Sequence, residues 1–87
     1  MKIIFLRQPY KFIKKADKDL KEKIEEEVLK IKENTSIGES LKGRLRGVRS
    51  HHFIFVKVSY RIAYKVVGDL IIISIATREN FYRDLKI

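Results

Sequence analysis

Residues 42–49, KGRLRGVR, carry the strongest signal for binding an anion. Four of the eight residues are basic and none is acidic, and two glycines allow the backbone to approach a ligand closely. Arg and Lys bind phosphate oxygens, and Arg can hold two of them at once. This stretch, called the basic segment below, favours contact with a nucleic-acid backbone over an ordinary solubilising surface. Its basic residues are Lys42, Arg44, Arg46 and Arg49.

A second group with chemical potential lies further along the chain. Residues 60–67 alternate between an apolar and a mixed set, which is typical of a half-buried strand. The apolar set is Tyr60, Ile62, Tyr64 and Val66. Arg61 therefore lies on the face of the sheet away from the core, called the open face below.

The preceding strand, predicted over residues 51–56, adds a histidine to the same face. If Phe55 pairs with Tyr60 across a four-residue loop, the core receives Phe53, Phe55, Tyr60 and Ile62, and His51 faces Tyr64. The open face then holds His52, Ile54, Arg61 and Ala63. Histidine is the side chain most readily poised for proton transfer near neutral pH. We therefore predict that His52 and Arg61 are neighbours, whereas His51 fills space in its strand.

The C-terminal residues complete this arrangement. Gly68-Asp69 is expected to form a two-residue type II′ turn. The apolar run from Leu70 to Ala76 is expected to form a strand inside the sheet, with neighbouring strands on both sides. A short helix from Arg78 to Lys86 would place Arg78 and Tyr82 on one side.

The elements that must support these residues come first in the chain. Residues 2–6 are predicted to form a strand that pairs with the strand at residues 70–76. Pro9 suits the first turn of a helix that ends near residues 16–17. Asp17 can cap a second, amphipathic helix. Its Glu25, Glu26 and Glu27 are interpreted as a solvated face, because consecutive carboxylates diverge around a helix. Residues 34–40 are expected to form a loop. The predicted fold is α+β: a small antiparallel-type sheet in the order β-α-α-β-β-β-α, with the helix pair on one face.

Composition narrows the functional classes. The 87 residues predict one domain, 1–87, without cysteine and with a net charge of +9. Residues 17–33 hold seven of the eleven acids against five lysines, so the rest of the chain is strongly cationic and favours an anionic partner. The N-terminal apolar run is too short for a signal peptide or a membrane span, which favours a cytoplasmic location. Neither a metal nor another cofactor is predicted, since adjacent His51 and His52 point to opposite faces.

The C-terminal half resembles the RelE/ParE superfamily of toxins from type II toxin-antitoxin pairs. The motif Tyr-Arg-Ile-Ala-Tyr-Lys-Val at 60–66, a turn, an apolar strand and Thr-Arg-Glu-Asn-Phe-Tyr at 77–82 carry this resemblance. It implies a toxin that is neutralised by a cognate antitoxin and, in ribosome-dependent members, an endoribonuclease (mRNA interferase) that cleaves mRNA on the ribosome.

The resemblance also assigns roles. Arg61 would stabilise the phosphate, Arg78 would neutralise developing charge or assist the leaving group, and Tyr82 would orient or deprotonate the ribose 2′-OH. Two lysines of the family correspond to His52 and Ile54 in this sequence. His52 is expected to take over the role of one lysine, whereas Ile54 cannot transfer a proton and the function of the other lysine is lost. RNA contacts are expected from the basic segment, Lys65 and Arg83. Two alternatives stay open: a ParE-like inhibitor of DNA gyrase, and a basic RNA- or ribosome-binding module without catalysis.

Overall fold

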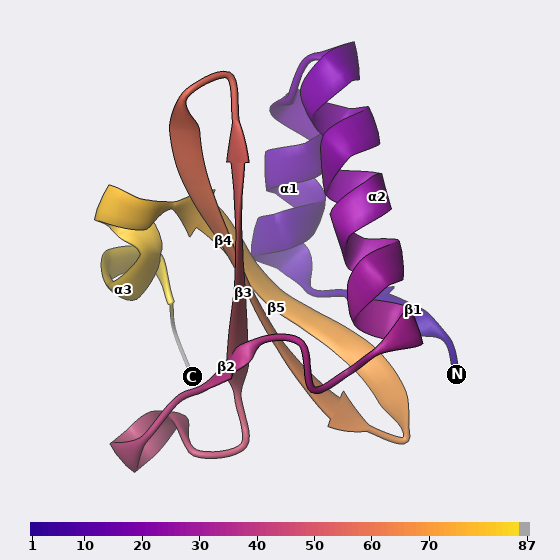
Figure 1. Cartoon of the computed structure of the whole chain (residues 1–87), viewed down its shortest axis with the longest axis vertical. Coiled ribbons are helices and arrows are strands. Elements are labelled where there is room, and N and C mark those ends of the chain that lie inside the picture. The colour runs from indigo at the N-terminus through magenta and orange to yellow at the C-terminus, as the bar shows by residue number, and fades with distance from the viewer. Residues whose placement is uncertain (86–87) are drawn as a thin grey trace.

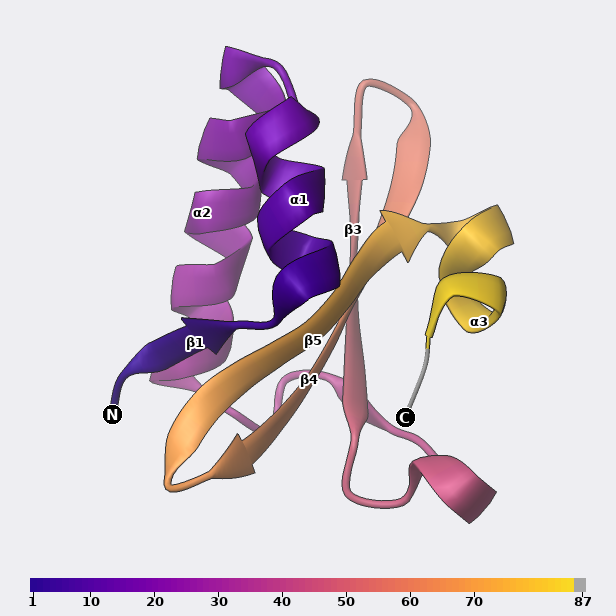
Figure 2. The same ribbon diagram turned by 180° about the vertical axis from the view of Figure 1, so that it is seen from behind.

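A five-stranded mixed sheet carries an N-terminal helix pair on one face, as Figures 1 and 2 show. The computed structural model describes residues 1–85 except the side chain of Asp84, so Lys86 lies outside the described residues. The strands are β1 (Ile3–Phe5), β2 (Glu39–Ser40), β3 (Arg49–Phe55), β4 (Val58–Val67) and β5 (Asp69–Thr77). The helices are α1 (Arg7–Lys15), α2 (Lys18–Glu33) and α3 (Phe81–Asp84), with 3-10 turns at Gly43–Leu45 and Arg78–Asn80. The predicted α+β class is confirmed.

The sheet order is β1-β5-β4-β3-β2, and only the β1–β5 pair is parallel. The apolar strand β5 therefore has neighbours on both sides, as its apolar character predicted. Strand β2 was not expected: two residues of the predicted loop pair with Arg49 and Ser50 and extend the sheet beyond β3. No helix within residues 1–85 is long and apolar enough to cross a membrane.

The helix pair forms for local reasons that the sequence shows. Asp17 caps α2 by accepting a hydrogen bond from the Leu20 amide at 2.9 Å, and Pro9 sits in the first turn of α1. Apolar positions of α2 at Ile24, Val28 and Ile31 are buried against the sheet. They pack with Phe53, Ile62, Tyr64, Leu70, Ile72 and Ile75 in the main core.

The β3–β4 hairpin confirms which face each residue occupies but corrects the predicted pairing. Phe53, not Phe55, pairs with Tyr60, and Phe55 pairs with Val58. The four-residue loop is therefore a two-residue turn at Val56 and Lys57, whose φ angles are 48° and 64°. Positive φ at both positions fits a type I′ turn, which matches the twist of the strands. The shift is an even number of residues, so every side chain keeps its face.

The turn between β4 and β5 also differs from its prediction. Asp69 already pairs with Val67, so Gly68 alone separates the paired residues, with φ 73°. The cause is a bulge: Ala63 pairs with Ser74 but Tyr64 pairs with Ile72, which leaves Ile73 as an extra residue in β5. The extra residue moves the register by one and shortens the turn.

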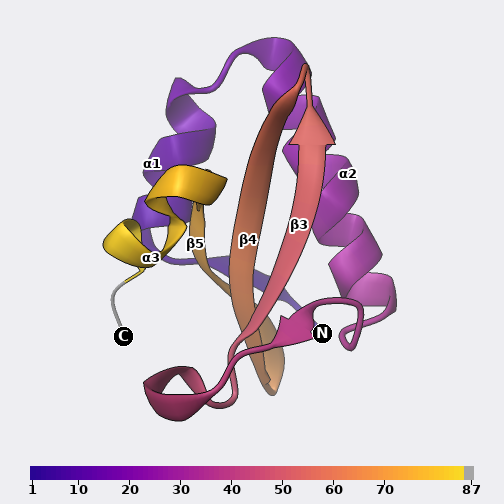
Figure 3. The same cartoon turned by 60° about the vertical axis from the view of Figure 1, so that its left-hand side comes forward.

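The open face is partly covered by the C-terminal segment, which lies across the sheet from α1 and α2 (Figure 3). Phe81 is fully buried there with Val48, Ala63 and Ile73 in a second, smaller core. Ala63 therefore lies on the open face, as predicted, and is buried there beneath the C-terminal segment. The short C-terminal helix is present, but the range predicted from Arg78 to Lys86 is corrected, because a 3-10 turn at Arg78–Asn80 precedes the four-residue α3. This break allows Phe81 to turn into the sheet.

The side chain of Gln8 supplies hydrogen-bond partners for the backbone of β5 beyond the end of β1. Its side-chain amide donates to the Ile75 carbonyl at 2.7 Å, and its oxygen accepts from the Ile75 amide at 2.9 Å. Gln8→Ala is expected to lower the free energy of unfolding by about 1–3 kcal/mol, because buried backbone groups lose their partners. Urea unfolding checks this value. The exposed Lys11→Ala on the same helix is the control, and an equal loss in both variants would contradict this role of Gln8.

Candidate functional site

Arg61 and His52 lie directly opposite each other on the open face, since they pair across β3 and β4. The side chains of directly paired residues in an antiparallel sheet are close neighbours. The predicted proximity is therefore confirmed, and the corrected register makes it closer than the expected pairing would have done. His52 is exposed and Arg61 is half-buried.

The Arg61 guanidinium is held by two groups. Its Nη1 donates to Ser50 Oγ at 3.3 Å, and its Cζ lies 5.9 Å from the centre of the Phe81 ring. Ser50 and Phe81 are both buried, so the arginine is supported from the sheet and from the C-terminal segment. A guanidinium has five N–H donors, and this support leaves others to face an incoming anion.

Arg78 and Tyr82 belong to the C-terminal segment and are both exposed. Arg78 follows Thr77, which pairs with Tyr60, so it lies at the sheet end that carries the β3–β4 turn. There it lines a surface pocket of about 390 Å³. Tyr82 packs edge-on against Phe81, with ring centres 4.9 Å apart. Phe81 thus contacts both Arg61 and Tyr82, which links two of the predicted site positions to one buried ring.

The basic segment is divided by the structure. Lys42, Arg44 and Arg46 are exposed around the 3-10 turn. Arg49 instead lies in β3, half-buried, and its Nη1 donates to the Gly38 carbonyl at 2.7 Å. Of the other predicted RNA contacts, Lys65 is half-buried in β4 and Arg83 is exposed on α3.

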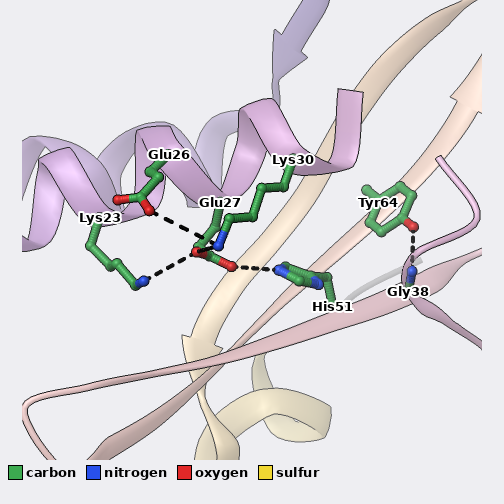
Figure 4. Close-up of polar contacts among 7 residues, drawn as sticks. All are labelled: Lys23, Glu26, Glu27, Lys30, Gly38, His51 and Tyr64. Atoms are coloured by element: carbon green, nitrogen blue, oxygen red, sulfur yellow. Dashed lines mark hydrogen bonds and ion pairs between the residues drawn. The ribbon is translucent and has the colours of Figure 1, made fainter. Parts of the chain in front are cut away.

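The predicted solvated face of α2 is wrong for Glu27. Its side chain is 4% exposed, and its Oε1 lies 2.8 Å from His51 Nε2. Lys23 and Lys30 approach its Oε2 at 3.2 Å and 2.9 Å, as Figure 4 shows. His51, expected only to fill space, therefore joins β3 to α2. The sequence signal is weak: Glu27 lies on the same side of the helix as Ile24 and Ile31, at spacings of three and four.

This cluster changes the acidity of the carboxyl group. Burial by itself raises the pKa of Glu27, but hydrogen bonds from His51, Lys30 and Lys23 overcome burial and lower the pKa from 4.5 to about 2. Glu27 is therefore a charged structural group on the helix side of the sheet, across from Arg61. It does not serve as a proton donor for chemistry on the open face.

Comparison with known proteins agrees with the motif at residues 60–82. A family model for the ParE-like toxin of type II bacterial toxin-antitoxin systems matches residues 3–86. Searches among curated proteins and among solved structures found no match to the chain. Because the family model spans nearly all of the sequence, the protein belongs to the ParE-like toxins of type II bacterial toxin-antitoxin systems.

Proposed function

We propose that this toxin is an endoribonuclease that cleaves mRNA on the ribosome and uses the ribose 2′-OH of the RNA as the nucleophile. The observation that carries the proposal is Arg61, which is fixed on the open face by Ser50 and Phe81 and lies directly opposite His52. A cation held in place before the reaction stabilises developing negative charge better than a mobile one.

Each group has a distinct role in this proposal. Arg61 stabilises the phosphorane that forms when the 2′-oxygen attacks phosphorus. His52 accepts the proton of the attacking 2′-OH and gives it to the leaving 5′-oxygen, so that a 2′,3′-cyclic phosphate and a free 5′-OH result. Its place directly opposite Arg61 in the β3–β4 pairing supports this role. Arg78 neutralises charge on the leaving 5′-oxygen, and Tyr82 orients the 2′-OH. The exposed cations of the basic segment, Lys42, Arg44 and Arg46, hold the RNA backbone.

A second candidate function, inhibition of DNA gyrase, is favoured by a different observation. Ile54 replaces a family lysine and is 62% exposed beside His52. Val56 and Val58, at the adjoining turn, are 76% and 40% exposed. An exposed apolar strip suits a protein target better than RNA. The retained Arg61, Arg78 and Tyr82 favour the nuclease.

The antitoxin is proposed to occupy the groove where β1, α1 and α2 meet. This groove has a volume of about 500 Å³ and is lined mainly by apolar side chains, including Phe5, Tyr10 and Ile24. Two cations, Lys14 and Lys21, and one anion, Glu25, complete the lining, so the groove carries a net positive charge. Such a surface fits a segment with apolar and acidic residues. The groove lies on the helix side of the sheet, so the antitoxin would need further chain to reach Arg61.

Toeprinting of translating ribosomes with purified toxin tests the proposed function. We expect cleavage of the messenger in phase with codons, and its suppression when a co-purified antitoxin is added. A parallel assay measures supercoiling of plasmid DNA by gyrase. Intact messenger combined with inhibited supercoiling would overturn the nuclease and establish the second candidate. Tight ribosome binding with neither effect would reduce the protein to a binding module.

A further inference from the structure

Helix α1 carries a cationic surface that the proposed cleavage site does not use. Residues 1–16 contain five basic residues and no acidic one. Four of them lie on α1 and are exposed to solvent. They are Arg7, Lys11, Lys14 and Lys15. Helix α2 differs, because its lysines are interspersed with seven acidic residues between positions 17 and 33.

Three of these residues form one stripe. Arg7, Lys11 and Lys15 recur at intervals of four, so they share a side of the helix, each about 6 Å further along its axis. Together with Gln8 and Phe12 they line a surface hollow of about 460 Å³. Among the side chains that the structure describes, none of the three has an ion-pair partner within 4 Å, whereas Lys23 and Lys30 of α2 both do. The three cations, called the α1 stripe, are available to an external anion.

The chemistry of the stripe fits RNA better than a protein. Lysine is depleted at protein–protein interfaces, whereas Lys and Arg make a large share of contacts to nucleic-acid phosphates. The apolar groove that suits a protein partner lies elsewhere, around Phe5 and Ile24. Phe12 is the aromatic residue that lines the same hollow as the stripe. It is half-buried and packs edge-on against Tyr60.

We propose that the α1 stripe is a second RNA-binding surface that holds the phosphate backbone of structured RNA. It lies on the helix side of the sheet, whereas Arg61 lies on the open face (Figure 3). The toxin would thus hold two RNA segments, with the messenger at Arg61 and a folded RNA of the ribosome at α1. This inference rests on the proposed function for the identity of the RNA. The stripe would orient the toxin on the ribosome without taking part in cleavage.

Binding to a double-stranded RNA hairpin, measured by fluorescence anisotropy over a range of salt concentrations, tests the proposal. The test variant combines Arg7→Gln, Lys11→Gln and Lys15→Gln. The slope of log affinity against log salt is expected to become shallower by about 2.7, since each of the three lost phosphate contacts contributes about 0.9. The control combines Lys2→Gln, Lys18→Gln and Lys32→Gln, which removes the same charge from exposed positions outside the stripe and should leave the slope nearly unchanged.

The outcomes separate this inference from the proposed function. Equal slopes for the two triple variants would overturn the α1 stripe, even if the wild-type toxin cleaves mRNA. Stripe-dependent hairpin binding by a toxin that cleaves no messenger would overturn only the nuclease. Loss of antitoxin binding with unchanged RNA affinity would identify the stripe as a protein-docking surface and overturn the proposal. Circular dichroism of both variants confirms that the comparison is between folded proteins.

Discussion

Arg61→Ala is expected to lower the rate of mRNA cleavage by about 100-fold to 1000-fold while the toxin stays folded and keeps its antitoxin. The physical reason is the loss of a cation that is positioned before the reaction begins. Arg61 is half-buried on the open face, and its contacts there are one weak hydrogen bond to Ser50 and one cation–π contact with Phe81. Truncation to alanine therefore lowers the free energy of unfolding by only about 1 kcal/mol. Single-turnover cleavage on programmed ribosomes measures the rate.

Companion variants locate the remaining chemistry. Arg61→Lys keeps the charge but not the planar guanidinium, so only a partial recovery is expected. His52→Ala and Arg78→Ala should each reduce cleavage, and Tyr82→Phe should do so only if the hydroxyl takes part. Val67→Ala, an exposed change on the same strand, is the control. If the alanine variants at Arg61, Arg78 and His52 all stay fully toxic, the nuclease proposal fails and gyrase becomes the better target.

The second large effect concerns stability. Glu27→Gln is expected to lower the free energy of unfolding by about 3 kcal/mol near neutral pH. The pKa of Glu27 is about 2 in the folded protein, against an ordinary value of 4.5, and a shift of that size corresponds to this energy. The amide keeps the shape of the side chain but loses the negative charge that His51, Lys23 and Lys30 share.

The dependence on pH has a definite sign. Because folding lowers the pKa, the stabilisation is fully present above about pH 4.5 and is lost as the pH falls towards about 2. The difference between wild type and Glu27→Gln should therefore shrink over that window in urea unfolding. Glu26→Gln, one residue away and with a side chain 60% exposed, should change stability by less than about 1 kcal/mol. A deficit that stays constant down to about pH 2 would argue against the lowered pKa.

Local features of the chain predicted much of this architecture. The Asp17 cap and the apolar spacing of α2 predicted that helix, because both depend on contacts within a few residues. Alternation in β4 placed Arg61 on the face opposite the helices, since side chains in a strand alternate irrespective of which strand lies beside it. The motif at residues 60–82 predicted the toxin family.

Pairings between distant residues were decided only by the tertiary structure. Val56 and Lys57 carry no turn signature, because neither is a residue that readily adopts positive φ, and so the tight turn and its register were not evident. The bulge at Ile73 likewise depends on how β5 fits between two strands. Glu27 illustrates the reason most clearly. In the sequence it is one of three consecutive glutamates, and it becomes a buried anion only because β3 places His51 against that turn of α2. A carboxylate is stable in such a position when partners replace the water that it loses, and the fold alone brings a partner from 24 residues away.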